Sequence, residues 1–170
     1  MSIRPIVTLP NPVLRRKARP VNRFDAALQT LIEDMIDTMR AAPGVGLAAP
    51  QVGVSQRVIV VEYAEDDEQE NSPKRLYVVV NPELKIASKE TETGVEGCLS
   101  IPGVAGEVER ARHVLVRGFN RHGQPLRIKA QGWLARIFQH EVDHLNGVLY
   151  TDRAVRIWEI KPEEAMADNV

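Results

Sequence analysis

The chain has 170 residues, of which 44% are hydrophobic and 26% are charged, as is ordinary for one compact globular domain with its own core. Its 22 basic and 23 acidic residues leave a formal charge of −1, which argues against a broad cationic surface for nucleic acid or anionic lipid. No apolar run approaches the roughly 20 residues of a membrane span, and the single cysteine excludes an intrachain disulfide. We therefore expect one soluble, cytoplasmic domain over residues 1–170, without a membrane partner or direct nucleic-acid specificity.

The first predicted element is a helix that follows the proline-rich opening of the chain. Apolar residues recur at helical spacing from Phe24 to Met39, and Asn22 and Asp25 are placed like a capping pair at its start. Pro43 lies just beyond the expected end, where a proline cannot continue a helix.

The stretch GVGLAAPQVG (44–53) follows this helix. It is too rich in Gly, Ala and Pro for a regular element and too apolar for an ordinary solvent loop. We expect another element to pack closely against it.

Strands are predicted in the middle of the chain. The β-branched runs 57–63 and 75–84 read as two strands joined by a solvated acidic loop. The segments 107–119 and 124–131 flank Asn120-Arg121-His122-Gly123, a turn signal, so a second hairpin is expected there.

A second helix is predicted from about Gly132 to Asn146-Gly147, where glycine supplies a C-terminal stop. One face is expected to be apolar, with Leu134, Ile137, Phe138, Leu145 and Val148. The opposite face carries polar residues, namely Arg136, Gln139, Asp143 and Asn146. The helix is therefore expected to be amphipathic.

The end of this helix, QHEVDHLNG (139–147), contains a His-Glu-x-x-His motif. His140 and His144 lie one helical turn apart and can coordinate one metal ion, and Glu141 can reach a water bound to that metal. A structural His/Glu cluster satisfied by hydrogen bonds is the alternative. Asp143 could orient His140 or form a surface ion pair with a basic neighbour.

The motif lacks a third protein ligand. The candidates are Cys98, His113, His122 and many carboxylates. Cys98 is favoured because it lies in the glycine-rich stretch TGVEGCLSIPG (93–103), and a thiolate with two imidazoles suits Zn²⁺ or Fe²⁺. The two other histidines are expected on a strand surface and in a turn. Against a ligand role, free cysteine usually acts as a small buried hydrophobe.

Three separated motifs together resemble one known family. In chain order, GVGLAAPQ (44–51), EGCLS (96–100) and QHEVDH (139–144) resemble the signature motifs of the peptide deformylases. The likeness extends to the TLPNPVLR opening and to the chain length. It implies an α+β fold over the whole chain, with antiparallel β-sheets packed around a central helix that carries the HEVDH motif, plus an N-terminal helix.

The resemblance also implies an enzyme, a metal-dependent hydrolase. Such enzymes remove the N-formyl group from the N-terminal formylmethionine of newly synthesised proteins and release formate. The expected partners are N-formylmethionyl nascent peptides, and a transient association with the ribosome is compatible with that role.

Carried over residue by residue, the resemblance makes Cys98, His140 and His144 the ligands of one divalent metal, with water at the fourth position. It favours Fe²⁺, although imidazole and thiolate ligands also accept Zn²⁺, Ni²⁺ or Co²⁺. Glu141 would act as general base and then as general acid.

Other family positions would surround the reacting group. Gln51, through its side-chain amide, and Leu99, through its backbone N–H, would hold the oxyanion. Without the resemblance, Gln51 would be interpreted as a polar loop residue that caps nearby backbone. Four residues match positions near the pocket for the formylmethionine side chain, namely Val45, Gly46, Trp133 and Ile137.

Two rival functions use the same residues. A metallopeptidase would apply the His-Glu-x-x-His motif to internal peptide bonds, and Cys98 within EGCLS argues against it. A non-catalytic, metal-stabilised binding module would need the metal only for folding.

Overall fold

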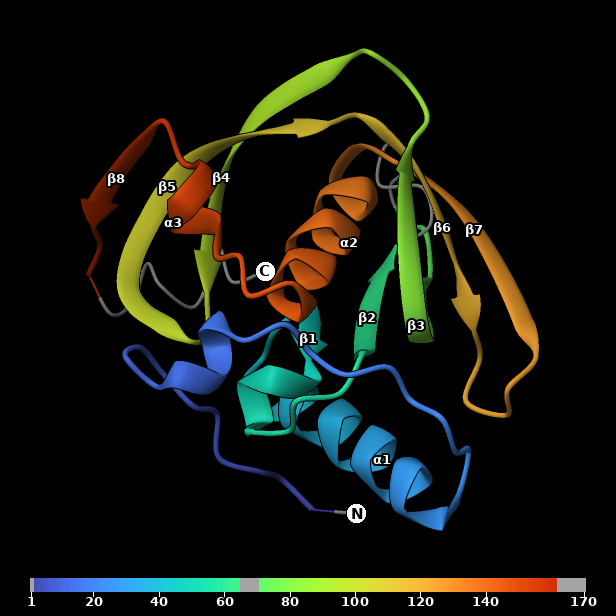
Figure 1. Ribbon diagram of the computed structural model, residues 1–170. Coiled ribbons are helices and arrows are strands. Elements are labelled where there is room, and N and C mark those ends of the chain that lie inside the picture. The colour runs from blue at the N-terminus through green and yellow to red at the C-terminus, as the bar shows by residue number, and fades with distance from the viewer. Residues whose placement is uncertain (1, 65–70, 162–170) are drawn as a thin grey trace.

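The computed structural model describes residues 2–64 and 71–161, and it contains two antiparallel sheets with a helix between them (Figure 1). The helical segments are η1 (Pro12–Arg15), α1 (Ala26–Ala41), η2 (Ala49–Val52), α2 (Gly132–Leu145) and α3 (Tyr150–Arg153). The strands are β1 (Gly46–Ala48), β2 (Val58–Ala64), β3 (Lys74–Ile86), β4 (Thr91–Cys98), β5 (Ile101–Ala111), β6 (His113–Phe119), β7 (Pro125–Gln131) and β8 (Arg156–Glu159).

The strands form a five-stranded sheet in the order β1-β2-β3-β6-β7 and a three-stranded sheet in the order β4-β5-β8. All neighbouring strands are antiparallel. Helix α2, which contains the HEVDH motif, lies between the two sheets in Figure 1, and α1 lies below the five-stranded sheet. The predicted α+β architecture is confirmed.

Helix α1 begins and ends close to the predicted positions. The side chain of Asp25 accepts a hydrogen bond from the backbone N–H of Leu28 at 3.0 Å, so Asp25, and not Asn22, is the N-cap. The helix ends at Ala41, two residues before Pro43. Its apolar face packs on one face of the sheet, against β2 and the middle of β3.

The β2–β3 pair and the β6–β7 hairpin also lie where the sequence predicts them. Most of the acidic loop between β2 and β3, residues 65–70, lies outside the described residues. The β6–β7 turn closes with Phe119 opposite Pro125.

The prediction of one strand over 107–119 is wrong, because the chain changes sheets at Arg112. Residues up to Ala111 belong to β5, and those from His113 belong to β6. The side chain of Gln139 donates to the carbonyl of Ala111 at 2.8 Å and accepts from its N–H at 3.0 Å. A side chain thus satisfies the backbone groups that would otherwise continue the strand pairing.

The expectation of no regular element in 44–53 is also wrong. The stretch contains β1 and η2, both short and almost entirely buried. The expected close packing is nevertheless present, and it is described with the site below.

Helix α2 is buried on more sides than its amphipathic pattern predicts. Arg136 and Gln139, assigned to the polar face, are 3% and 8% exposed, because the three-stranded sheet covers that face. Asn146 remains exposed and Asp143 is half-buried. Within residues 2–64 and 71–161, no helix has the length and apolar character needed to cross a membrane.

The turn after α2 requires a glycine, as predicted. Gly147 has φ of +73°, and a Cβ placed on it would lie 2.5 Å from the carbonyl oxygen of Arg15. Gly103 has a similar φ of +77°, but its Cβ would meet nothing within 4 Å. A comparison of substitutions at the two positions therefore distinguishes the cost of backbone strain from the cost of a steric clash.

We expect Gly147→Ala to destabilise the protein more than Gly103→Ala. Strain at positive φ alone costs about 1 to 2 kcal/mol, and the conflict with Arg15 adds to it only at Gly147. Thermal unfolding checks this, since each kcal/mol lowers the Tm of a chain of this size by about 2 to 4 °C. Equal losses for the two variants would contradict the steric argument.

Candidate metal centre and active site

The fold brings three predicted metal ligands together. His140 and His144 lie one turn apart on α2, with ring centroids 5.0 Å apart, and Cys98 is the last residue of β4. The Sγ atom of Cys98 lies 3.4 Å from Nε2 of His144. One ligand atom from each of the three residues lies within 4.8 Å of the other two, and all three side chains are buried.

The chemistry of this group fits a divalent metal ion. The Nε2 atom of His140 is buried and has no hydrogen-bond partner among the described residues. Burial lowers the pKa of His144 well below its usual range, so that imidazole stays neutral, the form that binds metals. Two imidazoles and one thiol are also a donor set that Zn²⁺ or Fe²⁺ accepts, with a fourth position left for water or substrate.

The other candidates for a third ligand lie elsewhere. His113 is half-buried at the start of β6, and His122 is exposed in the β6–β7 turn. Neither belongs to the group formed by Cys98, His140 and His144 within the described part of the chain. Their predicted positions on a strand and in a turn are confirmed.

His140 is oriented by Glu96, a residue that the sequence analysis did not single out. The Nδ1 atom of His140 lies 2.8 Å from Oε1 of Glu96, whose side chain is fully buried. A carboxylate at this distance favours a proton on Nδ1 and so leaves the lone pair of Nε2 free for a metal. The sequence signal that could have identified Glu96 was the presence of a carboxylate two residues before Cys98.

Two arginines hold the carboxylate of Glu96. Arg110 donates to both oxygens at 2.9 Å, and Arg136 donates to Oε2 at 2.7 Å. Burial by itself would raise the pKa of Glu96, but the hydrogen bonds from Arg110 and His140 outweigh it and hold that pKa well below its usual range. Glu96 therefore stays ionised against the imidazole.

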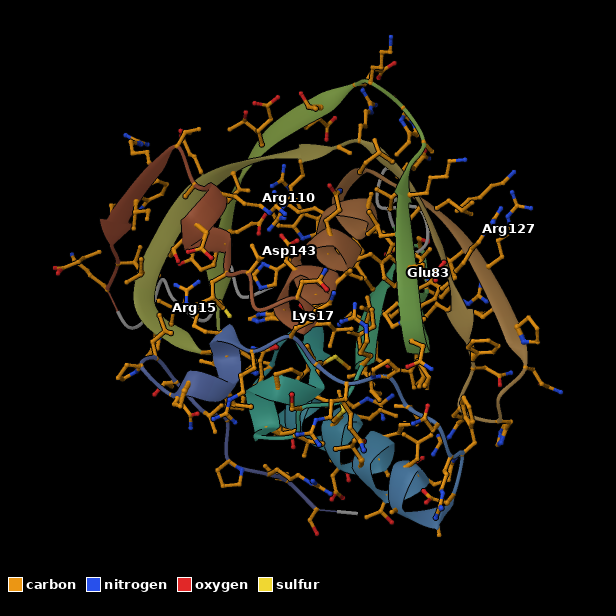
Figure 2. The ribbon with its side chains drawn as sticks, viewed as in Figure 1. Arg15, Lys17, Glu83, Arg110, Arg127 and Asp143 are labelled. Atoms are coloured by element: carbon orange, nitrogen blue, oxygen red, sulfur yellow. The ribbon has the colours of Figure 1, made fainter. Side chains whose placement is uncertain are left out.

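Asp143 forms an ion pair, which was one of the two alternatives for it. Its Oδ2 accepts from Arg110 at 2.6 Å and from Arg153 at 2.7 Å. Figure 2 shows Arg110 and Asp143 next to one another beside α2. Asp143 thus contacts the arginine that holds Glu96, while Glu96 is the carboxylate that contacts His140.

The side chain of Gln51 caps nearby backbone, one of the two interpretations considered for it, and it also approaches Cys98. Its Oε1 accepts from the backbone N–H of Ala48 at 3.0 Å, which fixes the η2 turn. Its Nε2 lies 3.6 Å from Sγ of Cys98 and 3.2 Å from the hydroxyl of Ser100. The amide nitrogen is therefore held beside Cys98 of the candidate metal site.

Glu141 lies on the same helix with its carboxylate fully buried. Both of its oxygens lack a hydrogen-bond partner among the described residues, and burial raises the pKa of Glu141 to about 7. A Cβ on Gly46 of β1 would lie 2.6 Å from Oε2 of Glu141. This is the close packing predicted for 44–53, and it explains the glycine.

The remaining predicted residues lie around these groups. Val45 and Trp133 are partly buried against the apolar cluster that contains Ile137, which is completely buried. Leu99 follows Cys98 directly, and its side chain is close enough to Gly44 to lie 3.1 Å from a Cβ placed there.

Tyr150 is a second residue that the sequence analysis missed. Its ring stacks on that of His140, with centroids 5.9 Å apart and an angle of 19° between the planes. Its hydroxyl donates to the carbonyl of Val104 at 3.0 Å. No short motif marked Tyr150, because it meets His140 only through the fold.

We expect Glu96→Gln to weaken metal binding by about 10- to 100-fold, because His140 loses the charge that orients it. The variant also leaves the buried guanidinium of Arg136 without a counter-charge and removes one of the two that Arg110 has, which costs about 3 to 5 kcal/mol of stability. Competition with a chromophoric chelator measures the affinity. Asp143→Asn is the control, since it contacts Arg110 but not His140, and unchanged affinity in folded Glu96→Gln would contradict this role.

Comparisons with known proteins agree on one family. The family model described as "Polypeptide deformylase" matches residues 3–159. A peptide deformylase from Symbiobacterium thermophilum is 51% identical over 157 residues, which are 92% of this chain and 69% of that relative.

Solved structures agree with the sequence matches. A peptide deformylase from Legionella pneumophila superimposes with a TM-score of 0.79 at 44% identity, covering 98% of this chain and 90% of that one. A Met-Ala-Ser-bound class I type b peptide deformylase from Acinetobacter baumannii gives a TM-score of 0.82 at 40% identity, covering 90% and 99%. With its motifs, its fold and these matches taken together, the chain belongs to the peptide deformylase family.

Proposed function

We propose that this chain hydrolyses the formamide of N-terminal formylmethionine in newly synthesised proteins and releases formate, with Glu141 as the group that moves the protons. Membership of the peptide deformylase family supports the reaction. The observation that carries the role of Glu141 is a fully buried carboxylate without a hydrogen-bond partner on the helix that bears two metal ligands.

Cys98, His140 and His144 are proposed to hold one divalent ion. A formamide is a poor electrophile, and water at neutral pH is a poor nucleophile. A metal bound there would address both, because it would polarise the formyl oxygen and lower the pKa of water. We propose Fe²⁺ because the family resemblance favours iron, while the donor set also accepts Zn²⁺, Ni²⁺ or Co²⁺.

The protein's own groups carry out the remaining steps. Glu141 accepts a proton from the attacking water, since a pKa near 7 suits a base at neutral pH. The amide of Gln51 and the N–H of Leu99 donate to the oxygen on which negative charge develops, and each such donor is worth about 10² to 10³ in rate. Glu141 then returns the proton to the leaving amine.

The methionine side chain is proposed to bind between β1 and the start of α2. Val45, Trp133 and Ile137 belong to, or pack on, one apolar cluster, which supports a shared pocket wall. Gly46 would border this pocket, and its lack of a Cβ leaves room for the carboxylate of Glu141.

We further propose that residues 1–170 form a single catalytic domain and that it acts in the cytoplasm. N-formylmethionyl nascent peptides are its proposed substrates, and a transient association with the ribosome would bring it to them.

We expect Glu141→Gln to lower kcat by about 10² to 10⁴ while metal content stays at the wild-type level. The amide keeps the size of the side chain but cannot accept the proton. Formate release from a formyl-Met peptide gives the rate, and elemental analysis gives the metal. Glu109→Gln, which changes an exposed carboxylate on β5, is the matched control. Full formate release by metal-replete Glu141→Gln would contradict the role of Glu141 in proton transfer.

Removal of the metal should abolish formate release, and Fe²⁺ added back without oxygen should restore it. The thiol and imidazoles are already close together, so restoration should not require refolding. An unformylated peptide tests the rival peptidase activity and should remain intact. If metal-replete protein released no formate from formyl-Met peptides, the proposed function would be wrong.

A further inference from the structure

One face of the five-stranded sheet is strongly basic. Side chains alternate across β6 and β7, so that residues such as Val116 and Ile128 pack toward α2 while their neighbours point away from it. The exposed cations that point away come from β3, β6 and β7, namely Lys85, Arg117, Arg127 and Lys129. We call these four residues, with Leu115 between them, the basic sheet face.

Helix α1 covers only part of this side of the sheet. It packs on Val58 and Val60 of β2 and on Val80 of β3, and Val80 pairs with Phe119 at the end of β6. The rest of β6 and all of β7 extend beyond the helix (Figure 1). Figure 2 shows Arg127 extending away from α2. The basic sheet face is therefore the part of this surface that the described residues leave uncovered.

Like charges lie next to one another on this face, and the described residues compensate them only in part. The register places Arg117 directly opposite Arg127, and like charges in that position destabilise a sheet. Glu83, opposite Arg117 on β3, is the one carboxylate that the register of the described strands places here. Among the described residues, none of the four cations forms a side-chain hydrogen bond or ion pair. The net charge of −1 thus conceals a local excess of positive charge.

Two grooves follow this face and meet at Arg127. One has a volume of about 500 Å³ and is lined by residues that include Glu83, Arg117 and Phe119. The other has a volume of about 790 Å³ and is lined by residues that include Lys85 and Lys129. Since Arg127 lines both, the surface fits an extended ligand rather than a single small anion.

The aromatic side chains beside the cations favour RNA over an acidic peptide. Phe119 is 38% exposed at the end of the first groove, and Phe24, 37% exposed, meets it edge-on with centroids 6.2 Å apart. His113 lines the other groove. Single-stranded nucleic acid stacks its bases on exposed rings and contacts nearby arginines through its phosphates. An acidic peptide would contact only the cationic side chains.

We propose that the basic sheet face binds single-stranded RNA through its phosphates, without base specificity. The bound strand would lie on the side of the sheet away from α2, so the catalytic groups would stay accessible. RNA binding is thus independent of the proposed deformylation, and either could fail without the other.

Fluorescence anisotropy with a labelled oligouridylate of about 12 nucleotides at low salt tests the proposal. We expect the triple variant Lys85→Ala/Arg127→Ala/Lys129→Ala to bind at least about tenfold more weakly than the wild type. The slope of log affinity against log salt should also fall by about 2, since each lost phosphate contact contributes about 0.7.

The control removes three other exposed cations with the same change in charge, as Arg16→Ala/Lys17→Ala/Arg23→Ala. Lys17 lies on the N-terminal segment, apart from Arg127 (Figure 2). This variant should bind RNA within about twofold of the wild type, and both variants should keep wild-type formate release.

Three results would overturn the proposal. The first is that the wild type does not bind the oligouridylate at low salt. The second is an equal loss of binding in the two triple variants, which would indicate a general charge effect. The third is preferential binding of polyglutamate or of phosphatidylserine vesicles in competition with the RNA, which would assign the face to an acidic protein or a membrane.

Discussion

The buried carboxylate of Glu96 connects the three-stranded sheet to the central helix and, at the same time, orients His140 of the candidate metal site. It comes from β4, while its partners are Arg110 of β5 and both Arg136 and His140 of α2. In a medium of low polarity, the charge of Glu96 is tolerable only with these arginines beside it. The position of the imidazole is therefore tied to the packing of the helix, and the site cannot loosen without loss of a buried ion pair.

The two faces of α2 are held in different ways. Toward the five-stranded sheet the contacts are apolar, and they centre on residues such as Phe138, whose ring meets that of Tyr77 edge-on. Toward the three-stranded sheet they are hydrogen bonds and ion pairs, including the two that Gln139 makes with Ala111. Apolar contacts tolerate some sliding, whereas the polar ones fix the register of the helix. That precision is needed where ligands from two elements must converge on one ion.

Much of this arrangement was predictable from the sequence, because local signals were strong. Helical periodicity and caps fixed both long helices, and the spacing of His140 and His144 identified a candidate metal site. Cys98 followed from thiol chemistry and from the resemblance to a family. What the sequence could not provide was information that depends on tertiary packing.

The errors have the same physical origin. The division of 107–119 depends on a hydrogen-bonded side chain from a helix about 28 positions away. Arg136 is buried because it pairs with Glu96 of the three-stranded sheet. Its charge suggested a solvent-exposed position, whereas the residue forms an internal ion pair. Glu96 approaches His140 from β4 and Tyr150 approaches it from α3, so the periodicity within α2 indicates neither contact.

The contact between Gly46 and Glu141 has a consequence for how this site can vary. The wall beside the carboxylate is made of main chain, and even one methyl group would occupy the place of an oxygen. Main-chain atoms of a paired strand are the same whatever the neighbouring side chains are. The space around the Glu141 carboxylate is therefore set by strand geometry, and changes in the surrounding side chains leave that space unaltered.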